Sequence, residues 1–307
     1  MREIIVADKI LKIPENQPKI TFVDIVNHIK SVKKPVKPNY ISNTATIFNY
    51  DCLEILSRIP ENSIDMVFAD PPYMLSNNGF TCQNGRMVDV NKGKWDKSNG
   101  FEIDSIFHET WINSCRRVLK PEGTIWISGT YHSIYQCGYL LQKNNFHILN
   151  DIAWFKPNAS PNLSCRFFTA SHETLIWARK DKKAKHTFNY NEMKNGFFPE
   201  DKLKKERTQM RSVWSIPPPK ISEKICGKHP TQKPLDLLLR IITSSTNQGD
   251  IILDPFNGAG TTGVASMVVG NRNYIGIEID KSYCDITINR LKEVVKLNSE
   301  SLFSESE

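Results

Sequence analysis

The stretch SIDMVFADPPY, residues 63–73, carries an apolar run directly into Asp70, Pro71, Pro72 and Tyr73. A carboxylate at a strand end accepts hydrogen bonds, and the Pro71 carbonyl beside it is held stiffly because proline fixes φ. Two neighbouring acceptors suit an amino group that has two protons to donate. The Tyr73 ring offers a stacking face for a planar base, at about 1–3 kcal/mol per base. The order of residues therefore predicts a pocket for an aromatic amine, with a plain turn as the structural alternative.

A second stretch, DIILDPFNGAGTTG at 250–263, also ends an apolar run in a carboxylate, that of Asp254. Gly258 and Gly260 permit backbone angles and a close approach that a Cβ would block, and a helix starting there presents unpaired N–H groups. Asp254 would repel a pyrophosphate but attract an ammonium, and the G-K-[ST] of a P-loop is absent. The next predicted strand ends at Glu278, about where an acidic residue meets ribose hydroxyls in nucleotide-binding halves. S-adenosylmethionine fits a ligand with a ribose, a positive charge and no phosphates, whereas NAD fits poorly; a purely structural glycine turn is the alternative.

Alternating strands and helices position both stretches. Short apolar strands are predicted at 46–50, 63–69, 123–128, 146–155, 250–254 and 273–279. Helices are predicted between them at 52–59, 101–120, 132–143, 234–246, 257–269 and 284–297. This alternation predicts an α/β fold with a doubly wound, mostly parallel sheet, in which ligands bind at the carboxyl ends of the strands.

The strand and helix rhythm divides the chain into five segments. We expect an N-terminal extension at 1–39 with a short helix near 20–29, and a first half of the sheet domain at 40–157. A small insertion with one clear strand at 173–180 is expected at 158–227, the second half of the domain at 228–297 and a disordered tail at 298–307. Within the first half, residues 76–100 are polar and glycine-rich, which predicts a long loop suited to a flap.

Charge and cysteine content narrow the class of protein. The net charge is +7, and residues 179–228 hold fourteen Lys or Arg against six Asp or Glu, a net of +8. Such a cluster attracts polyanions, of which nucleic acid is the commonest, although a solubilising surface is an equal alternative. No apolar run approaches the length of a membrane span, and no secretory signal is visible. The seven cysteines form no C-x-x-C pair, which favours a reducing cytoplasm and no metal site.

The motifs D-P-P-Y at 70–73 and D-P-F-N-G-A-G-T-T at 254–262 stand in an informative order. With the D-P-P-Y block first and the glycine block last, the chain resembles the β class of DNA adenine-N6 methyltransferases of bacterial restriction–modification systems, nearest to the second adenine methylases of the Dpn type. Further matching pieces are NYDCLEIL, KWD, LKPEGTIWISG, WFKPNASPN and GKHPTQKP, so that the resemblance spans about 44–296. It implies a Rossmann-like fold with circularly permuted motifs, in which 158–227 is the target-recognition region.

The resemblance also implies roles for individual residues. A flipped adenine would be held by Asp70, Pro71, Pro72 and Tyr73. The methyl donor would be bound by Asp51, Cys52, Asp70, His229, Thr231, Gln232, Lys233, Asp254, Phe256, Asn257, Gly258, Gly260, Thr261, Thr262 and Glu278. DNA contacts are expected from Lys94, Trp95, Lys156, Asn158, Arg166, Arg207 and Arg211, the arginines because a guanidinium fork pairs with guanine.

The implied activity is methyl transfer from S-adenosylmethionine to adenine N6 within a specific sequence of double-stranded DNA, with single-stranded DNA as a second substrate form. The nucleotide must swing out of the duplex, and Asp70 and the Pro71 carbonyl would then hold its amino group while the methyl transfers in line. The resemblance further implies a restriction endonuclease as a functional rather than physical partner, and a homodimer.

Several alternatives remain open from the sequence. Cytosine N4 is one alternative target, although the cytosine enzymes usually carry Ser at the position of Asp70, and an adenine in RNA is another. A nicotinamide-dependent oxidoreductase on a Rossmann sheet would leave D-P-P-Y without a role. A catalytically inactive DNA-binding regulator would bind DNA but transfer no methyl group.

Overall fold

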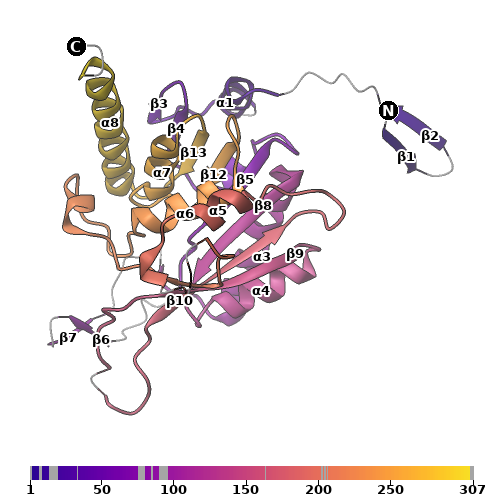
Figure 1. Ribbon diagram of the computed structural model, residues 1–307. Helices are drawn as coiled ribbons and strands as arrows, with labels where there is room; N and C mark the ends of the chain where they lie inside the picture. Colours follow the sequence, from indigo (N-terminus) through magenta and orange to yellow (C-terminus); the bar gives the residue numbers. More distant parts are fainter. Residues whose placement is uncertain are drawn as a thin grey trace.

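The computed structural model describes residues 2–6, 9–13, 20–32, 34–74, 80–83, 86–89, 96–162, 164–201, 203, 205 and 207–304. In this part of the chain a mixed sheet has the strand order β11–β9–β10–β8–β5–β12–β13–β4–β3 (Figure 1). Its strands are β3 (Tyr40–Ile41), β4 (Ala45–Phe48), β5 (Ile64–Ala69), β8 (Leu119–Gly129), β9 (His147–Phe155), β10 (His172–Arg179), β11 (Val213–Ser215), β12 (Ile251–Asp254) and β13 (Asn273–Ile277). Five of the neighbouring pairs are parallel, whereas β10 runs antiparallel to both its neighbours and β3 to β4.

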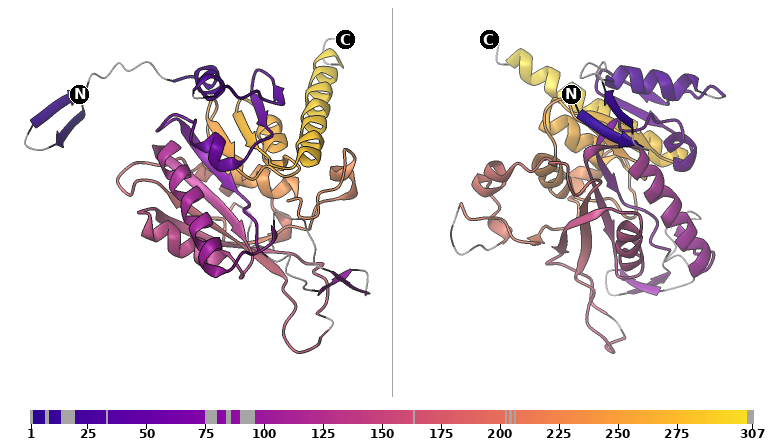
Figure 2. Two further views of the ribbon diagram at one scale, coloured as in Figure 1. Left: turned by 180° about the vertical axis from the view of Figure 1, so that it is seen from behind. Right: turned by 90° about the vertical axis from the view of Figure 1, so that its right-hand side faces the viewer.

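Helices cover both faces of this sheet. One face packs against α1 (Phe22–Ser31), α2 (Cys52–Leu56), α3 (Phe101–Val118) and α4 (Ile134–Lys143). The other packs against α6 (Leu235–Ser245), α7 (Thr261–Val269) and α8 (Lys281–Ser304), while the short helix α5 (Tyr190–Asn195) lies beside α6 (Figure 2). The expected doubly wound, mostly parallel sheet is therefore confirmed.

Alternation along the central strands builds both cores. In β5, Val67 and Ala69 belong to the cluster under α1–α4, whereas Met66 and Phe68 belong to the cluster under α6 and α7. All four side chains are at most 2% exposed, as expected for a parallel strand that is covered on both faces. This burial makes the strand read as one continuous apolar run.

The register brings the ends of several strands to one edge of the sheet. Ala69 of β5 lies beside Ile127 of β8, and Gly129 at the end of β8 lies beside Thr174 near the start of β10. His172 in turn pairs with Phe155 at the end of β9. The segments that follow β5, β8 and β9 therefore emerge at the same edge.

The N-terminal region and the C-terminal end differ from expectation. The helix expected near 20–29 is present as α1, but Ile25 and Ile29 are fully buried in the main core, so this part of the extension belongs to the sheet domain. At the other end α8 continues to Ser304, where a disordered tail was expected from residue 298.

Two internal segments also differ. Residues 76–100 were expected to be a loop, but β6 (Phe80–Gln83) and β7 (Arg86–Asp89) form an antiparallel pair within them. Residues 158–227 were expected to be an insertion, yet they supply β10 and β11 to the main sheet. A further antiparallel pair, β1 (Arg2–Val6) with β2 (Lys9–Ile13), lies near the N-terminus, and short 3-10 turns occur at Pro199–Asp201 and Ile221–Lys224.

The apolar spacing of α3 predicts a face on which Trp111, Cys115 and Val118 are indeed buried, but the start of the helix differs from it. Ile103 and Ile106 are 57% and 65% exposed, whereas Asp104 and His108 are buried. Asp104 accepts hydrogen bonds from the Ser98 hydroxyl and the Asn99 N–H, which stabilises it in this position. Among the described residues, none of the helices combines the length and the apolar character that a membrane span requires.

Candidate active site

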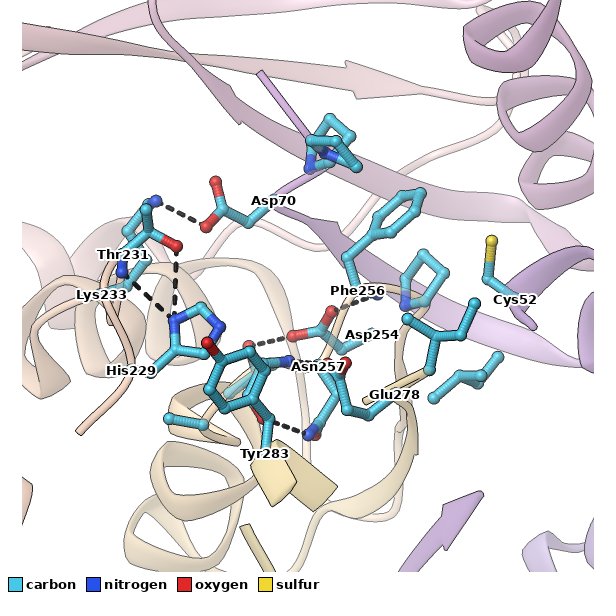
Figure 3. A pocket seen from close by; sticks show the side chains of 18 of the residues that line it. Cys52, Asp70, His229, Thr231, Lys233, Asp254, Phe256, Asn257, Glu278 and Tyr283 are labelled. Carbon is cyan, nitrogen blue, oxygen red and sulfur yellow. Dashed lines mark hydrogen bonds and ion pairs between the residues drawn. The ribbon is translucent and has the colours of Figure 1, made fainter. Parts of the chain in front are cut away.

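A cavity of about 240 Å³ opens at the carboxyl ends of β5, β12 and β13 (Figure 3). It brings the two sequence stretches together, since the Asp70 turn and the Gly258 loop both line it. All residues expected to hold the adenine line the cavity, and so do all those expected to bind the donor except Gly260. The shared cleft expected from the sequence is thus present.

The loop between β12 and α7 depends on two glycines. Gly258 and Gly260 have φ of +53° and +72°, which L side chains rarely adopt. A Cβ on Gly260 would lie 2.4 Å from the Thr287 methyl carbon, so this residue lets the loop pack against α8. Gly260 therefore shapes the loop on the side that faces α8 and does not line the cavity.

Asn257 also acts on the loop itself. Its side-chain amide donates to the Thr287 hydroxyl at 2.7 Å and its side-chain oxygen accepts from the Tyr274 hydroxyl at 2.7 Å. The side chains of both partners, Thr287 and Tyr274, are fully buried. The Asn257 side chain thus fixes the loop against β13 and α8, although the residue borders the cavity.

Two buried carboxylates, Asp254 and Glu278, line the cavity beside the loop that follows β12. Asp254 accepts hydrogen bonds from the Phe256 N–H at 3.0 Å and the Thr262 hydroxyl at 2.6 Å. Glu278 accepts from the Gly258 N–H at 2.6 Å and the Asp280 N–H at 2.8 Å. Burial raises the pKa of each carboxyl to about 7, despite these hydrogen bonds. A ligand that brings a positive charge or hydroxyl donors would favour their ionised forms.

Asp51 and Cys52 lie at the start of α2. The Asp51 carboxylate caps this helix by accepting from the Leu53 and Glu54 N–H groups at 2.8 and 3.3 Å. Burial raises the pKa of the Cys52 thiol to about 12, so it stays protonated and offers the cavity an uncharged surface.

The segment before α6, residues 229–233, borders the cavity and brings a cation, the Lys233 ammonium, into it. The His229 ring lies 4.2 Å from the Tyr283 ring and stands against Gly258, and its Nδ1 accepts from the Thr231 N–H at 3.3 Å. The Gln232 amide donates to the Glu223 carbonyl at 2.9 Å. The Lys233 ammonium instead reaches the Asp70 carboxylate (Figure 3).

Asp70 is held at both oxygens. One accepts from the Tyr73 hydroxyl at 2.6 Å, and the other accepts from the Lys233 ammonium at 2.6 Å. Burial raises the pKa of Asp70, and Lys233 opposes that rise. Burial also opposes the charge on Lys233, but Asp70 and Glu173 outweigh it and raise the pKa of the ammonium. The strand-end acceptor thus forms a buried ion pair.

Glu173, near the start of β10, was not among the residues expected from the sequence. It accepts from Lys156 at 2.5 Å and from the Tyr73 hydroxyl at 3.1 Å, and it lies 3.5 Å from the Lys233 ammonium. Burial would raise its pKa, but the two lysines bring it to about 2. Two carboxylates and two ammonium groups therefore balance within one buried network. No local pattern marks Glu173, because only the antiparallel pairing of β10 with β8 places it beside Tyr73.

Asp96 is a second residue that was missed. It is 1% exposed, and one oxygen accepts from the Tyr73 and Met74 N–H groups at 2.8 and 2.9 Å. It stabilises the backbone that follows the two prolines. Asp96 is the last residue of the KWD piece, from which the sequence drew only Lys94 and Trp95 as candidates; these two lie outside the described residues.

The other residues expected to contact DNA are spread over the surface. Lys156 lies beside the target-base residues through its ion pair with Glu173. Asn158 and Arg166 are exposed on the loop between β9 and β10, and Arg207 and Arg211 are exposed before β11. The tryptophans of this region, Trp154, Trp177 and Trp214, are buried core residues, as expected.

Comparison with known proteins agrees with this geometry. A family model described as DNA methylase matches residues 64–289. The chain belongs to this DNA methylase family. Its relatives include the type II methyltransferase M2.MboI of Moraxella bovis, 48% identical over 261 residues that cover 84% of this chain and 92% of the relative. The type II methyltransferase M2.DpnII of Streptococcus pneumoniae is 49% identical over 257 residues, which cover 83% and 92%.

Solved structures of DNA methylases have the same fold. The M1.HpyAVI complex with SAM is 30% identical, with a TM-score of 0.58 over 80% of this chain and 98% of that chain. The cytosine-N4-specific PvuII DNA methyltransferase is 17% identical, with a TM-score of 0.62 over 85% and 93%, a likeness of fold alone. The resemblance drawn from the sequence is thus confirmed. The alternative of a nicotinamide-dependent oxidoreductase is wrong, because the chain belongs to the DNA methylase family.

Proposed function

We propose that this DNA methylase transfers the methyl group of S-adenosylmethionine to the exocyclic N6 of an adenine within a specific DNA sequence. The observation that carries the proposal is the single cavity that holds a strand-end acceptor, Asp70, and the glycine loop after Asp254. A site that brings a flipped base next to a methyl donor needs these two parts in the same cavity.

The donor would lie along the loop between β12 and α7. Asp254 and Glu278 are the acidic groups that suit the ammonium of its methionine part and the hydroxyls of its ribose. Phe256 and the Cys52 side chain supply apolar surface at the same end. The solved complex of M1.HpyAVI with SAM supports this placement by likeness of fold.

The target adenine would occupy the end of the cavity near Asp70. Its amino group would replace a present partner of the carboxylate and donate its second proton to the Pro71 carbonyl. These bonds draw the N6 lone pair out of conjugation and stabilise the positive charge that develops on N6 during transfer. Lys233 supports this step by favouring the ionised form of Asp70.

The biological setting that follows is a restriction–modification system. The methylase would protect its target sequence in double-stranded DNA, and in single strands, from a restriction endonuclease that acts on the same sequence without binding the methylase. This role would place the protein in the cytoplasm, where the DNA is. The type II methyltransferases of Moraxella bovis and Streptococcus pneumoniae support it through their similarity to this chain.

The decisive experiment compares wild type with Asp70→Ala and Asp70→Asn on labelled donor. Genomic DNA from expressing cells, sequenced with modification detection, identifies the target base and its sequence. Oligonucleotides of that sequence are then offered as duplex DNA, single-stranded DNA and RNA. We expect transfer to adenine N6 in DNA, lost in both variants while donor binding persists. Methylation at cytosine N4, preference for RNA, or DNA binding without transfer would each refute the proposal.

We further propose a homodimer that uses the outer faces of α3 and α4. These neighbouring helices are joined by an ion pair between Lys143 and Glu109 at 2.9 Å. Both expose large apolar side chains, with exposed fractions of at least 57%: Phe101, Ile103, Ile106, Tyr135 and Tyr139. A second copy of the chain would cover this face, because self-association through one patch gives a closed two-fold assembly.

Light scattering tests the homodimer directly. Ile106→Glu together with Tyr139→Glu should halve the measured mass, while Val268→Glu, which alters an exposed position on α7, should leave it unchanged. A monomeric wild-type protein would refute the homodimer and would leave the proposed methyl transfer untouched.

A further inference from the structure

The loop of residues 156–171 joins β9 to β10 at the edge of the sheet where the cavity lies. Figures 1 and 2 show it projecting from the body at the same end as β6 and β7. Near its tip stand two neighbouring aromatic residues, Phe167 and Phe168, which are 68% and 97% exposed. The folded chain leaves these rings in water, although aromatic side chains usually account for much of a protein's buried area.

The neck of this loop is tied to the residues of the target-base pocket. The Lys156 N–H donates to the Ser171 carbonyl at 2.7 Å, which closes the loop. The Lys156 side chain binds Glu173, which also accepts from the Tyr73 hydroxyl. The two phenylalanines therefore extend from the same buried network that holds Asp70.

The tip of the loop is held in a definite turn. Asn162 donates through its side-chain amide to the Phe167 carbonyl at 2.8 Å, and its N–H donates to the Thr169 hydroxyl at 3.2 Å. Cys165 adopts a φ of +53° within this turn. The turn presents the rings outward, and beyond Lys156, which pairs with Glu173, the loop carries Arg166 and no Asp or Glu. A basic loop that ends in exposed rings suits a polyanion whose interior is made of stacked bases.

We propose that Phe168, with Phe167 beside it, enters the DNA duplex at the target adenine when that base leaves the stack. Removing a base from the duplex costs a few kcal/mol of stacking and pairing. An apolar ring inserted at the vacated step keeps the neighbouring base pairs apart and stacks on the partner base that stays behind. Arg166 contacts the adjoining phosphates. This inference rests on the proposed function, because it assumes that a flipped base is the substrate.

The test uses three DNA substrates of one target sequence. They are the ordinary duplex, the same duplex with an abasic site opposite the target adenine, and the single strand. In the abasic duplex and the single strand the target adenine is unpaired, so it leaves the helix at lower cost, and no partner base is present for an inserted ring to stack on. The variants are Phe168→Ala and Phe167→Ala, with Phe197→Ala as a matched control, because Phe197 is 83% exposed but lies on another segment.

We expect Phe168→Ala to lower kcat/KM on the ordinary duplex about tenfold, the size of one lost stacking contact. On the abasic duplex and the single strand it should stay within about twofold of wild type, since displacing an unpaired adenine costs less and no partner base remains for the ring to stack on. Phe197→Ala should match wild type on all three. Equal losses on every substrate, an unchanged rate on the duplex, or a wild-type enzyme that accepts only single strands would each overturn the proposal. Absence of transfer on all substrates by the wild type would refute the proposed function instead.

Discussion

At the scale of single residues, the ion pair with Lys233 opposes the rise that burial imposes on the pKa of Asp70. Lys233 is 6% exposed and lies 2.6 Å from the Asp70 oxygen, and Glu173 holds it from the other side. An opposite charge at this distance lowers a carboxyl pKa by about 1–3 units relative to the same buried group alone. The network therefore sets the pH range over which Asp70 can accept a hydrogen bond from an amino group.

Replacing Lys233 with Met should move the pH profile of turnover. Without the ammonium, burial raises the Asp70 pKa further, so the carboxyl is protonated over a wider pH range. The acidic limb of the kcat profile should therefore shift to higher pH, with activity partly restored at alkaline pH. Lys233→Arg keeps the charge and should shift the limb less. A uniform loss of activity at every pH in the Met variant would contradict this account.

Donor binding should depend on pH through Asp254 and Glu278. Both carboxyls have a pKa of about 7 because of burial, so each is largely protonated at pH 6 and ionised at pH 8. A cationic donor prefers the ionised forms, and its Kd should therefore rise as the pH falls from 8 to 6, by up to about tenfold per unit for each carboxyl. Isothermal calorimetry across this range measures it. Asp254→Asn should bind weakly with a shallower pH dependence, and an equal wild-type Kd at both pH values would sink the prediction.

At the scale of elements, the loop between β12 and α7 keeps its shape because Gly260 lets it approach α8. Gly260→Ala combines a positive φ with a Cβ placed 2.4 Å from Thr287, whose hydroxyl holds Asn257 and the Gly258 carbonyl. Gly270→Ala is the matched control, since it has a φ of +77° and open space around it. Gly260→Ala should lose about 1–2 kcal/mol of unfolding free energy from its left-handed backbone, and Gly270→Ala, with a ψ of 155° that is essentially confined to glycine, about 1–3 kcal/mol. Only Gly260→Ala should also lose donor affinity, by tenfold or more at about 1.4 kcal/mol per decade; similar affinity in the two variants would argue against the close approach.

The helix α1 behaves as part of the main core and not as an appendage. Ile25 is fully buried under the sheet, whereas Val23 on the same helix is 60% exposed. Ile25→Ala should lower the free energy of unfolding by about 2–5 kcal/mol, and Val23→Ala by less than about 0.5 kcal/mol. Urea unfolding followed by tryptophan fluorescence measures both. Equal effects would mean that α1 does not contribute to the cooperative unit.

At the scale of the whole molecule, the fold divides the basic stretch that the sequence presents as one segment. Arg179, at the end of β10, pairs with His147 and Thr124, which lie at the starting ends of β9 and of the apolar part of β8. The lysines that follow it therefore lie at the edge opposite the cavity, while β11, which belongs to the same stretch, lies toward the cavity edge, as does the β9–β10 loop outside the stretch. Only part of the positive charge of residues 179–228 therefore lies at the cavity edge, where a bound DNA duplex would present its target base.

Salt dependence of DNA binding should reveal this division. Arg166→Ala should weaken binding to all DNA sequences and reduce the slope of log K against log salt by about one, as expected for one phosphate contact. Lys182→Ser with Lys183→Ser removes two charges from the opposite edge and should leave the slope unchanged. A fluorescence anisotropy titration at several salt concentrations distinguishes the two, and a larger effect from the lysine pair would place the DNA on the other edge.

The sequence by itself determined the alternation of strands and helices and the two motif-bearing turns. These features are local, since apolar periodicity defines each strand, and Pro71, Gly258 and Gly260 restrict or free the backbone where they stand. Parallel strands then bring their carboxyl ends to one edge by geometry alone, so the shared cavity of Asp70 and Asp254 was predictable before any coordinates.

Only the tertiary structure decided which partners surround those turns. Glu173 meets Tyr73 and Lys233 through the antiparallel placement of β10, and Asp96 supports the Tyr73 backbone from 23 residues away along the chain. The buried face at the start of α3 and the separation of the basic stretch likewise follow from packing between distant segments. Burial and ion pairing depend on neighbours that are remote in sequence, and for that reason composition and spacing could name Asp70 but not its buried ion pair with Lys233.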